Sequence, residues 1–290
     1  MKLINIINII KHTKKNPFIL FYLLMSICIL HLSPMDTMGK NTYFLSTIEY
    51  PSLFQKEKTK GKGYGMARDL TTEAFIASGS DVRYQILPMA RCIKMYKKYA
   101  ANVGAIDWFK NAQMMNKVLY ANVAHSKFVL FYKKKKFPGG IHFSKLEDLK
   151  KYGRIGNVRG SSTTKIVQKA GLKIDWADSL KCNFKKLNGN RFDIAISIQI
   201  AGWNTLEHLY PDRIDEFDCC QKTIFEIPIS VTFRKKNKAI YDEFMDGLKT
   251  IANNGKYREV LERYYENKKI PDKIVALLNQ YKSFDKLSAR

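Results

Sequence analysis

The sequence predicts an α/β fold in which strands and helices alternate and the sheets are largely parallel. Short segments rich in β-branched and aromatic residues are followed repeatedly by segments whose apolar residues recur at helical spacing. Such alternation is typical of layered α/β domains. The composition agrees with a globular protein, because 46% of the 290 residues are hydrophobic and 26% are charged.

The N-terminus has the layout of a signal peptide. Lysines precede an apolar run at residues 18–30 that contains no charge. At 1.5 Å per residue this run spans roughly 20 Å, less than the ~30 Å hydrocarbon core of a membrane. We therefore expect residues 1–35 to be a signal peptide, with an uncleaved anchor as the alternative. The remaining roughly 255 residues suit two lobes better than one core.

The first half of the mature chain contains strand and helix signals in alternation. Residues 43–47 predict a strand and residues 64–78 a helix. Residues 82–87 predict the next strand, and Pro88 then stands in the first turn of a helix, where its missing N–H costs nothing. Residues 104–109 predict a short strand.

The middle of the chain continues the alternation. Residues 128–132 predict a strand that ends before a proline–glycine turn. Ser144 with Glu147 three residues later predicts a capped helix start. The other predicted elements are a strand at 154–158, a helix from the Ser/Thr run at 161–164 to Ala170, and a strand at 193–197.

The closing segment is the most clearly patterned part of the chain. Residues 227–233 predict a strand, and residues 257–265 predict a helix after the stop signal at 253–255. Residues 271–290 are expected to form a helical cap. Between strand and stop signal, a helix is predicted from four apolar residues on one face: Ile240, Phe244, Leu248 and Ile251.

Charge is the one extreme property of the composition. The chain carries 50 Lys and Arg against 26 Asp and Glu, a net charge of +24, which attracts anions. The basic residues are spread along the chain, and the dense run at 133–136 is better explained as a solvated strand end than as a nucleic-acid patch. We expect no nucleic-acid partner.

Cysteines and histidines show no metal-binding spacing, so no metal and no cofactor is expected. Cys28 would leave with the signal peptide. The other four cysteines, Cys92, Cys182, Cys219 and Cys220, permit disulfides in an oxidising compartment. Spacing does not give their connectivity, and a bridge from Cys182 to Cys219 or Cys220, in the same expected lobe, is the candidate pairing.

Six motifs stand in the order and at the spacing of one known family. They are Tyr50-Pro51, Gly63-Tyr64-Gly65 with Asp69-Leu70, PMARC at 88–92, GNVRGSS at 156–162, NRFD at 190–193, and the closing segment at 227–265. Over residues 43–265 the chain resembles the bacterial extracellular solute-binding proteins of family 3.

The resemblance implies a two-lobed periplasmic-binding-protein fold of type 2. Each lobe would be a mostly parallel sheet flanked by helices, and the lobes would close on a ligand by hinge motion. Lobe 1 is expected at 40–127 with 236–290, and lobe 2 at 128–235. The two hinge strands are expected at 128–134 and 228–235.

Within that fold, the Ser/Thr run at 161–164 is expected to hold an anionic group through its amides and hydroxyls, or else to be a simple helix cap. Arg91 can bind a carboxylate or pair with an acid in its own lobe. Asp107, Trp108 and Phe109 would supply one carboxylate and an aromatic wall, although one of the two rings is expected to pack in the core. The full set of expected ligand residues is Tyr50, Arg91, Asp107, Trp108, Phe109, Ser161, Ser162, Thr163, Ser197 and Gln199.

Two departures from the family concern the ligand. Amino-acid binders of the family carry an arginine for the α-carboxylate, and Met114 or Met115 stands at that position here. They also carry an acid for the α-ammonium, which falls near Ile198. A standard α-amino acid is therefore not the expected ligand, and Ser197, Gln199 and Trp203 can furnish a different polar and aromatic surface.

The function that follows is a periplasmic solute-binding protein, a monomer that captures a small polar ligand with an anionic group for the permease of an ABC-type transporter in the inner membrane. A sensory ligand-binding module is the alternative. An enzyme resembling the cyclohexadienyl dehydratases would need Asp107 or Glu73 as acid or base. Since the sequence shows no paired carboxylates and no nucleophile with a base, we expect no enzymatic activity.

Overall fold

The computed structural model describes residues 40–59, 61–95, 98–105, 115–265 and 270–288. The expected signal segment, and the expected ligand residues Asp107, Trp108 and Phe109, lie outside these residues. Within the described part of the chain, no helix combines the length and apolar character needed to cross a membrane.

Nine strands form one sheet of mixed direction, in the order β2-β1-β3-β9-β4-β7-β5-β6, with β8 paired to β4. Two parallel groups, β2-β1-β3 and β7-β5-β6, flank the antiparallel pair β9 and β4. The strands are β1 (Thr42–Thr47), β2 (Asp81–Ile86), β3 (Ala101–Ala105), β4 (Val118–Lys133), β5 (Arg154–Val158), β6 (Lys173–Ala177), β7 (Ile194–Ile198), β8 (Phe217–Cys219) and β9 (Phe225–Arg234).

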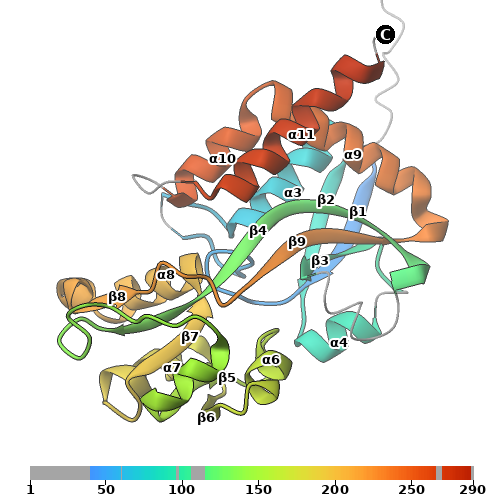
Figure 1. The fold of residues 1–290 in the computed structure, drawn as a ribbon. Coiled ribbons are helices and arrows are strands. Elements are labelled where there is room, and N and C mark those ends of the chain that lie inside the picture. Colours follow the sequence, from blue (N-terminus) through green and yellow to red (C-terminus); the bar gives the residue numbers. More distant parts are fainter. Residues whose placement is uncertain (1–39, 60, 96–97, 106–114, 266–269, 289–290) are drawn as a thin grey trace, which may run out of the picture. The chain divides into compact units, whose positions relative to one another are not determined.

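The helices divide between the two parallel groups (Figure 1). Helices α3, α9, α10 and α11 pack together beside the β2-β1-β3 group, and α6, α7 and α8 lie with the β7-β5-β6 group. Their bounds are α3 (Met66–Ala77), α4 (Met89–Lys94), α6 (Thr164–Lys169), α7 (Leu180–Asn188), α8 (Gln199–Leu209), α9 (Lys238–Asn253), α10 (Lys256–Tyr265) and α11 (Asp272–Ser288). Four 3-10 turns are η1 (Met115–Lys117), η2 (Leu146–Tyr152), η3 (Pro211–Glu216) and η4 (Lys235–Asn237).

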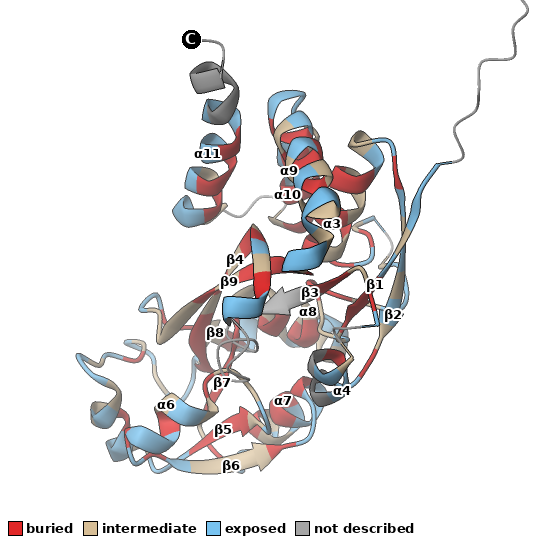
Figure 2. Ribbon diagram, turned by 90° about the vertical axis from the view of Figure 1, so that its right-hand side faces the viewer, coloured by how far each residue is buried: buried red, intermediate tan, exposed pale blue. Residues whose placement is uncertain are grey.

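The predicted α/β alternation is confirmed, and so is the closing strand–helix–helix segment. On α9, Phe244, Leu248 and Ile251 are buried, while Ile240 is half-buried at the edge of the same core. The Phe244 ring lies 4.9 Å from that of Phe75 on α3, centroid to centroid. Figure 2 shows the buried residues concentrated on the strands and on the helix faces turned toward them. The lobe limits of 40–127 with 236–290, and 128–235, stay a prediction.

Strand β4 is much longer than the predicted segment at 128–132. It pairs with β9 from Val118 to Phe128 and with β7 from Phe128 to Tyr132. The first half contains no continuous apolar run, because the polar residues Asn122, His125, Ser126 and Lys127 interrupt it. One strand thus takes part in both halves of the sheet.

A β-bulge interrupts β4 between Asn122 and Ala124, where the register to β9 shifts. Two tyrosine hydroxyls bind carbonyls there: Tyr257 of α10 donates to Val123 O at 2.6 Å, and Tyr281 of α11 donates to Asn122 O at 2.6 Å. Both tyrosines are buried. The irregular backbone is therefore held by the two C-terminal helices.

The helix predicted from Ser144 and Glu147 forms as the 3-10 segment η2. Its capping carboxylate is Asp148, which accepts from the backbone N–H of Ser144 at 2.8 Å and of Lys145 at 3.0 Å. These bonds lower the pKa of Asp148. The acid predicted to cap the segment, Glu147, is therefore one residue before the acid that does so, Asp148.

The expected bridge from Cys182 to Cys219 or Cys220 is wrong, because all four cysteines in the described part of the chain are free. Cys182 is exposed on α7, whereas Cys219 and Cys220 are buried at β8. Among the described residues, no group of three or more His, Cys, Asp and Glu side chains is placed to hold a metal ion.

Candidate functional site

A cavity of about 450 Å³, which we call the cleft cavity, lies at the carboxyl ends of strands from both parallel groups. This edge of an α/β sheet is where ligands ordinarily bind. The loops after β1, β2 and β5 meet here with the end of β7 and with β9. The lining includes Tyr50, Leu87, Pro88, Ser161, Ser162, Ile198, Ile227 and Ile229.

Tyr50 stands in the tight loop that follows β1. Its backbone N–H donates to Phe54 O at 2.6 Å, and its own carbonyl accepts from Phe54 N at 2.8 Å. Burial raises the pKa of Tyr50 to about 12, and hydrogen bonds with the Ser197 side chain and the Ile198 backbone oppose that shift. The neutral phenol of Tyr50 therefore hydrogen-bonds with Ser197. The two expected ligand residues are thus in contact, although they belong to different parallel groups of strands.

The serine loop, residues 160–163, follows β5 and is positioned by Asn157. The buried Asn157 amide donates to Thr163 Oγ1 at 2.9 Å, and its Oδ1 accepts from Val158 N at 2.9 Å and Ser161 Oγ at 3.2 Å. Within the loop, Thr163 is fully buried, while Ser161 and Ser162 line the cavity. Asn157 is a positioning residue that motif reading missed, although it lies inside the GNVRGSS motif.

The helix after this loop contributes little to the electrostatics of the site. Helix α6 begins at Thr164, is six residues long and has no side-chain cap. A helix this short has a weak dipole, so the donors for an anion are the Ser162 hydroxyl and the amides of the loop itself, since the Ser161 hydroxyl already donates to Asn157.

Two exposed ion pairs stand at the rim of the cleft cavity. Arg159 Nε lies 3.5 Å from Asp178 Oδ1, and Lys56 Nζ lies 3.6 Å from Glu49 Oε2. Exposed pairs of this kind contribute little to stability, so either cation can exchange its partner for an anionic ligand. Lys56 belongs to no motif of the sequence, whereas Arg159 adjoins Gly160, the glycine of the serine loop.

Arg91 is exposed on α4 and is not part of the cavity lining. The helix is fastened by its neighbour Cys92, whose Sγ lies 3.4 Å from Ser46 Oγ and whose carbonyl accepts from Asn102 Nδ2 at 3.2 Å. The Asn102 amide also bonds to Ser46. Burial raises the pKa of Cys92, which keeps its thiol protonated as part of this internal polar cluster.

Gln199 lies at the first position of α8, one residue past Ile198, and lines a separate cavity together with Trp203. The expected ligand residues therefore divide. Tyr50, Ser161 and Ser162 line the cleft cavity. Ser197 does not line it but hydrogen-bonds with Tyr50, which does. The lining does not include Thr163, Arg91 or Gln199.

Comparison with solved structures shows the fold. The chain is similar to a structure from work on glutathione import through GshT and the cystine ABC importer TcyBC of Streptococcus mutans, at 20% identity and a TM-score of 0.62, covering 81% of this chain and 98% of that one. It is similar to an ancestral arginine-binding protein bound to arginine, at 19% identity, a TM-score of 0.61 and coverage of 78% and 99%. It is also similar to the GluR0 ligand-binding core from Nostoc punctiforme in complex with L-glutamate, at 12% identity, a TM-score of 0.61 and coverage of 77% and 99%.

No curated protein shows significant sequence similarity to the chain. The sequence profile of one family does match, over residues 46–267, which include the end of β1, strands β2 to β9, the loops of the cleft cavity and the closing segment. The fold is that of the type 2 periplasmic binding proteins. The chain belongs to the bacterial extracellular solute-binding proteins, family 3.

Proposed function

We propose that the protein captures a small polar ligand with an anionic group in the cleft cavity and delivers it to the permease of an ABC-type transporter. The observation that carries the proposal is the serine loop, held by Asn157, which presents Ser161 and Ser162 to a cavity of ligand size. Family membership supports capture of a solute. Transport is supported by the similarity in fold to structures from amino-acid and glutathione uptake.

The anionic group would be bound by the hydroxyl of Ser162, by the amides of the serine loop and by Arg159, whose exposed pair with Asp178 is easily exchanged. Much of the remaining lining is apolar and includes Ile198, Ile227 and Ile229. The resemblance to the family puts the acid that binds the α-ammonium of amino acids near Ile198, where this chain has no acid. We therefore favour an organic acid or another ligand with an apolar portion over a free α-amino acid.

Tyr50, in the loop after β1, already hydrogen-bonds with Ser197 at the end of β7, and closure would draw the two parallel groups of strands further together around the cleft cavity. A ligand bound between them would be enclosed by both parallel groups of strands. The expected setting is the periplasm, reached by export through residues 1–35, with the protein acting as a monomer and without turnover of the ligand.

The test is a thermal-shift screen of the purified protein against organic acids, opines, amino acids and short peptides. A true ligand raises the melting temperature in a saturable manner. Ser162→Ala should then weaken its binding by about tenfold, the loss expected for one charge-assisted hydrogen bond, and Arg159→Gln should act in the same direction. Ser283→Ala, an exposed serine on α11, is the control.

Affinity unchanged in both Ser162→Ala and Arg159→Gln would remove the cleft assignment. A ligand recovered chemically altered after incubation would instead indicate an enzyme on this scaffold.

A sensory role is the second candidate, and the similarity in fold to the GluR0 ligand-binding core favours it. Sensing would use the same cleft and the same closure. The two roles differ in the partner. A transport protein stimulates ligand uptake by its permease in reconstituted vesicles, whereas a sensory module binds a receptor and leaves uptake unchanged.

A further inference from the structure

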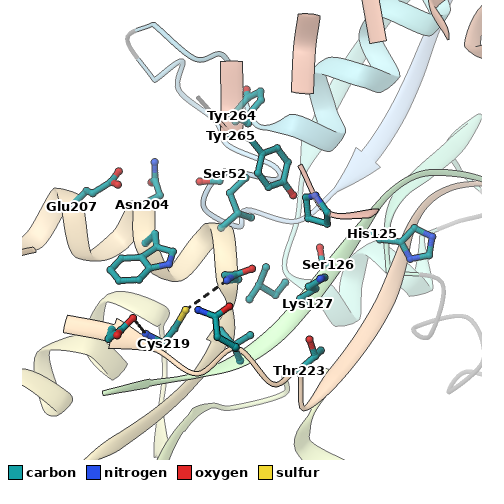
Figure 3. A pocket seen from close by; sticks show the side chains of 18 of the residues that line it. Ser52, His125, Ser126, Lys127, Asn204, Glu207, Cys219, Thr223, Tyr264 and Tyr265 are labelled. Carbon is teal, nitrogen blue, oxygen red and sulfur yellow. Dashed lines mark hydrogen bonds between the residues drawn. The ribbon is translucent and has the colours of Figure 1, made fainter. Parts of the chain in front are cut away.

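A second cavity of about 530 Å³ lies between α8, the middle of β4, the segment after β8 and the end of α10 (Figure 3). Among the described residues it shares one lining residue, Ile198, with the cleft cavity. Its volume falls in the range of small-molecule sites. It is a separate compartment, and the proposed function leaves it without a role.

The wall formed by β4 contains an unsatisfied polar group. Ser126 is 3% exposed, and no residue in the described part of the chain gives its hydroxyl a hydrogen-bond partner. An unpaired buried hydroxyl destabilises the folded state, because it has lost its hydrogen bonds to water without gaining others. Ser126 lines the second cavity, beside Lys127 in Figure 3, so a ligand in the cavity can supply the missing partner.

Two neighbouring groups point to the same use. Gln199 Nε2 donates to Cys219 Sγ at 3.6 Å, and because thioether and thiol sulfurs are weak acceptors, a ligand oxygen would be a better partner. Ser52, also buried in the lining, has a φ of 61°. Non-glycine residues held in this left-handed region cluster at ligand sites.

The described lining of the second cavity carries more acidic than basic side chains, whereas the whole protein is strongly basic. Among the described residues the cavity has three carboxylates, Glu207, Asp218 and Asp272, and two lysines, Lys62 and Lys127. The chain as a whole carries +24. His125 adds no positive charge at neutral pH, because burial and nearby Lys273 lower its pKa.

One wall combines an aromatic ring with a carboxylate. Trp203 and Glu207 are four residues apart on α8 and therefore lie on the same face of the helix. Figure 3 shows Glu207 and Asn204 on this helix, with Tyr265 entering the cavity from α10. Aromatic faces beside a carboxylate are the usual means of holding an organic ammonium group.

We propose that the second cavity binds a small organic cation, whose ammonium group lies beside Trp203 and Glu207 and whose hydrogen-bonding group reaches Ser126. This site is independent of the cleft cavity, so both can be occupied in the same molecule.

The experiment uses ligand-observed NMR titrations of the purified protein with choline, ethanolamine and 3,3-dimethylbutan-1-ol, the uncharged carbon analogue of choline. Choline and ethanolamine should bind saturably, and the uncharged alcohol about tenfold or more weakly. Glu207→Gln should weaken both amines about tenfold, and Ser126→Ala about threefold. Trp203→Phe, which keeps an aromatic face, should weaken them less than Glu207→Gln.

Two controls separate this site from the rest of the protein. Glu262→Gln removes an exposed carboxylate on α10 and should leave amine binding unchanged. Ser162→Ala, in the cleft cavity, should also leave it unchanged. The proposal is overturned if neither amine binds at millimolar concentration, if Glu207→Gln binds both as the wild type does, or if Ser162→Ala removes the binding.

Discussion

Replacement of Asn157 by alanine tests whether the serine loop is held by one buried amide. The change removes three hydrogen bonds, to Thr163, Val158 and Ser161, of 2.9, 2.9 and 3.2 Å. At about 0.5 to 1.5 kcal/mol each, with a small cavity term because the side chain is 1% exposed, the free energy of unfolding should fall by about 2 to 4 kcal/mol. This is a large share of the 5 to 15 kcal/mol typical of a domain.

Urea denaturation followed by circular dichroism measures this loss, and Asn279→Ala, an exposed change of the same chemistry on α11, is the matched control. A ligand of the cleft cavity should also bind Asn157→Ala more weakly, since Ser161 loses its support. An unfolding free energy within about 0.5 kcal/mol of the wild type, the range of ordinary surface changes, would refute the assigned role of Asn157.

Two further predictions concern stability. Gly247→Ala on α9 should lower the free energy of unfolding by about 1 to 3 kcal/mol, although alanine is ordinarily the better helix former. The reason is that a Cβ at this position would clash with the backbone oxygen of Ala74 on α3. Gly139→Ala, in open space, is the control, and equal denaturation midpoints for the two variants would contradict the close helix contact. Burial and nearby Lys273 lower the pKa of His125, so on acidification the unfolded chain binds a proton at a higher pH than the folded chain does. The free energy of unfolding therefore falls as the pH drops below about 6.5. His125→Gln should lose less stability than the wild type between pH 7.5 and 5.5, and identical pH profiles would show that His125 is not the cause of the loss.

Much of the fold follows from local sequence patterns. The helices α9 and α10 are predictable because Phe244, Leu248 and Ile251 repeat at helical spacing and the run at 253–255 is a helix stop signal. In the structure Gly255 has the positive φ, 88°, that such a stop requires. Strand β4 was only half predicted, since its first part owes its place to pairing with β9 and not to an apolar run. Pairing between distant segments leaves little local trace.

The site was predicted in its loops and missed in its supports. Ser161 and Ser162 could be found from a motif. Gln199, by contrast, lines the second cavity and not the cleft cavity, because α8 begins directly after Ile198. The role of Asn157 depends on side-chain directions across a turn. Neither can be read from residue type, because asparagine and glutamine serve equally well on a surface.

The bulge in β4 has a consequence for the order in which the chain folds. Its carbonyls at Asn122 and Val123 find their donors in Tyr281 and Tyr257, which are 159 and 134 residues further along the chain. A nascent chain that has just emerged past β4 lacks these donors, so this part of the sheet stays incomplete until the last helices are made. Contacts of such separation slow folding, so we expect α10 and α11 to dock onto the middle of β4 late in folding.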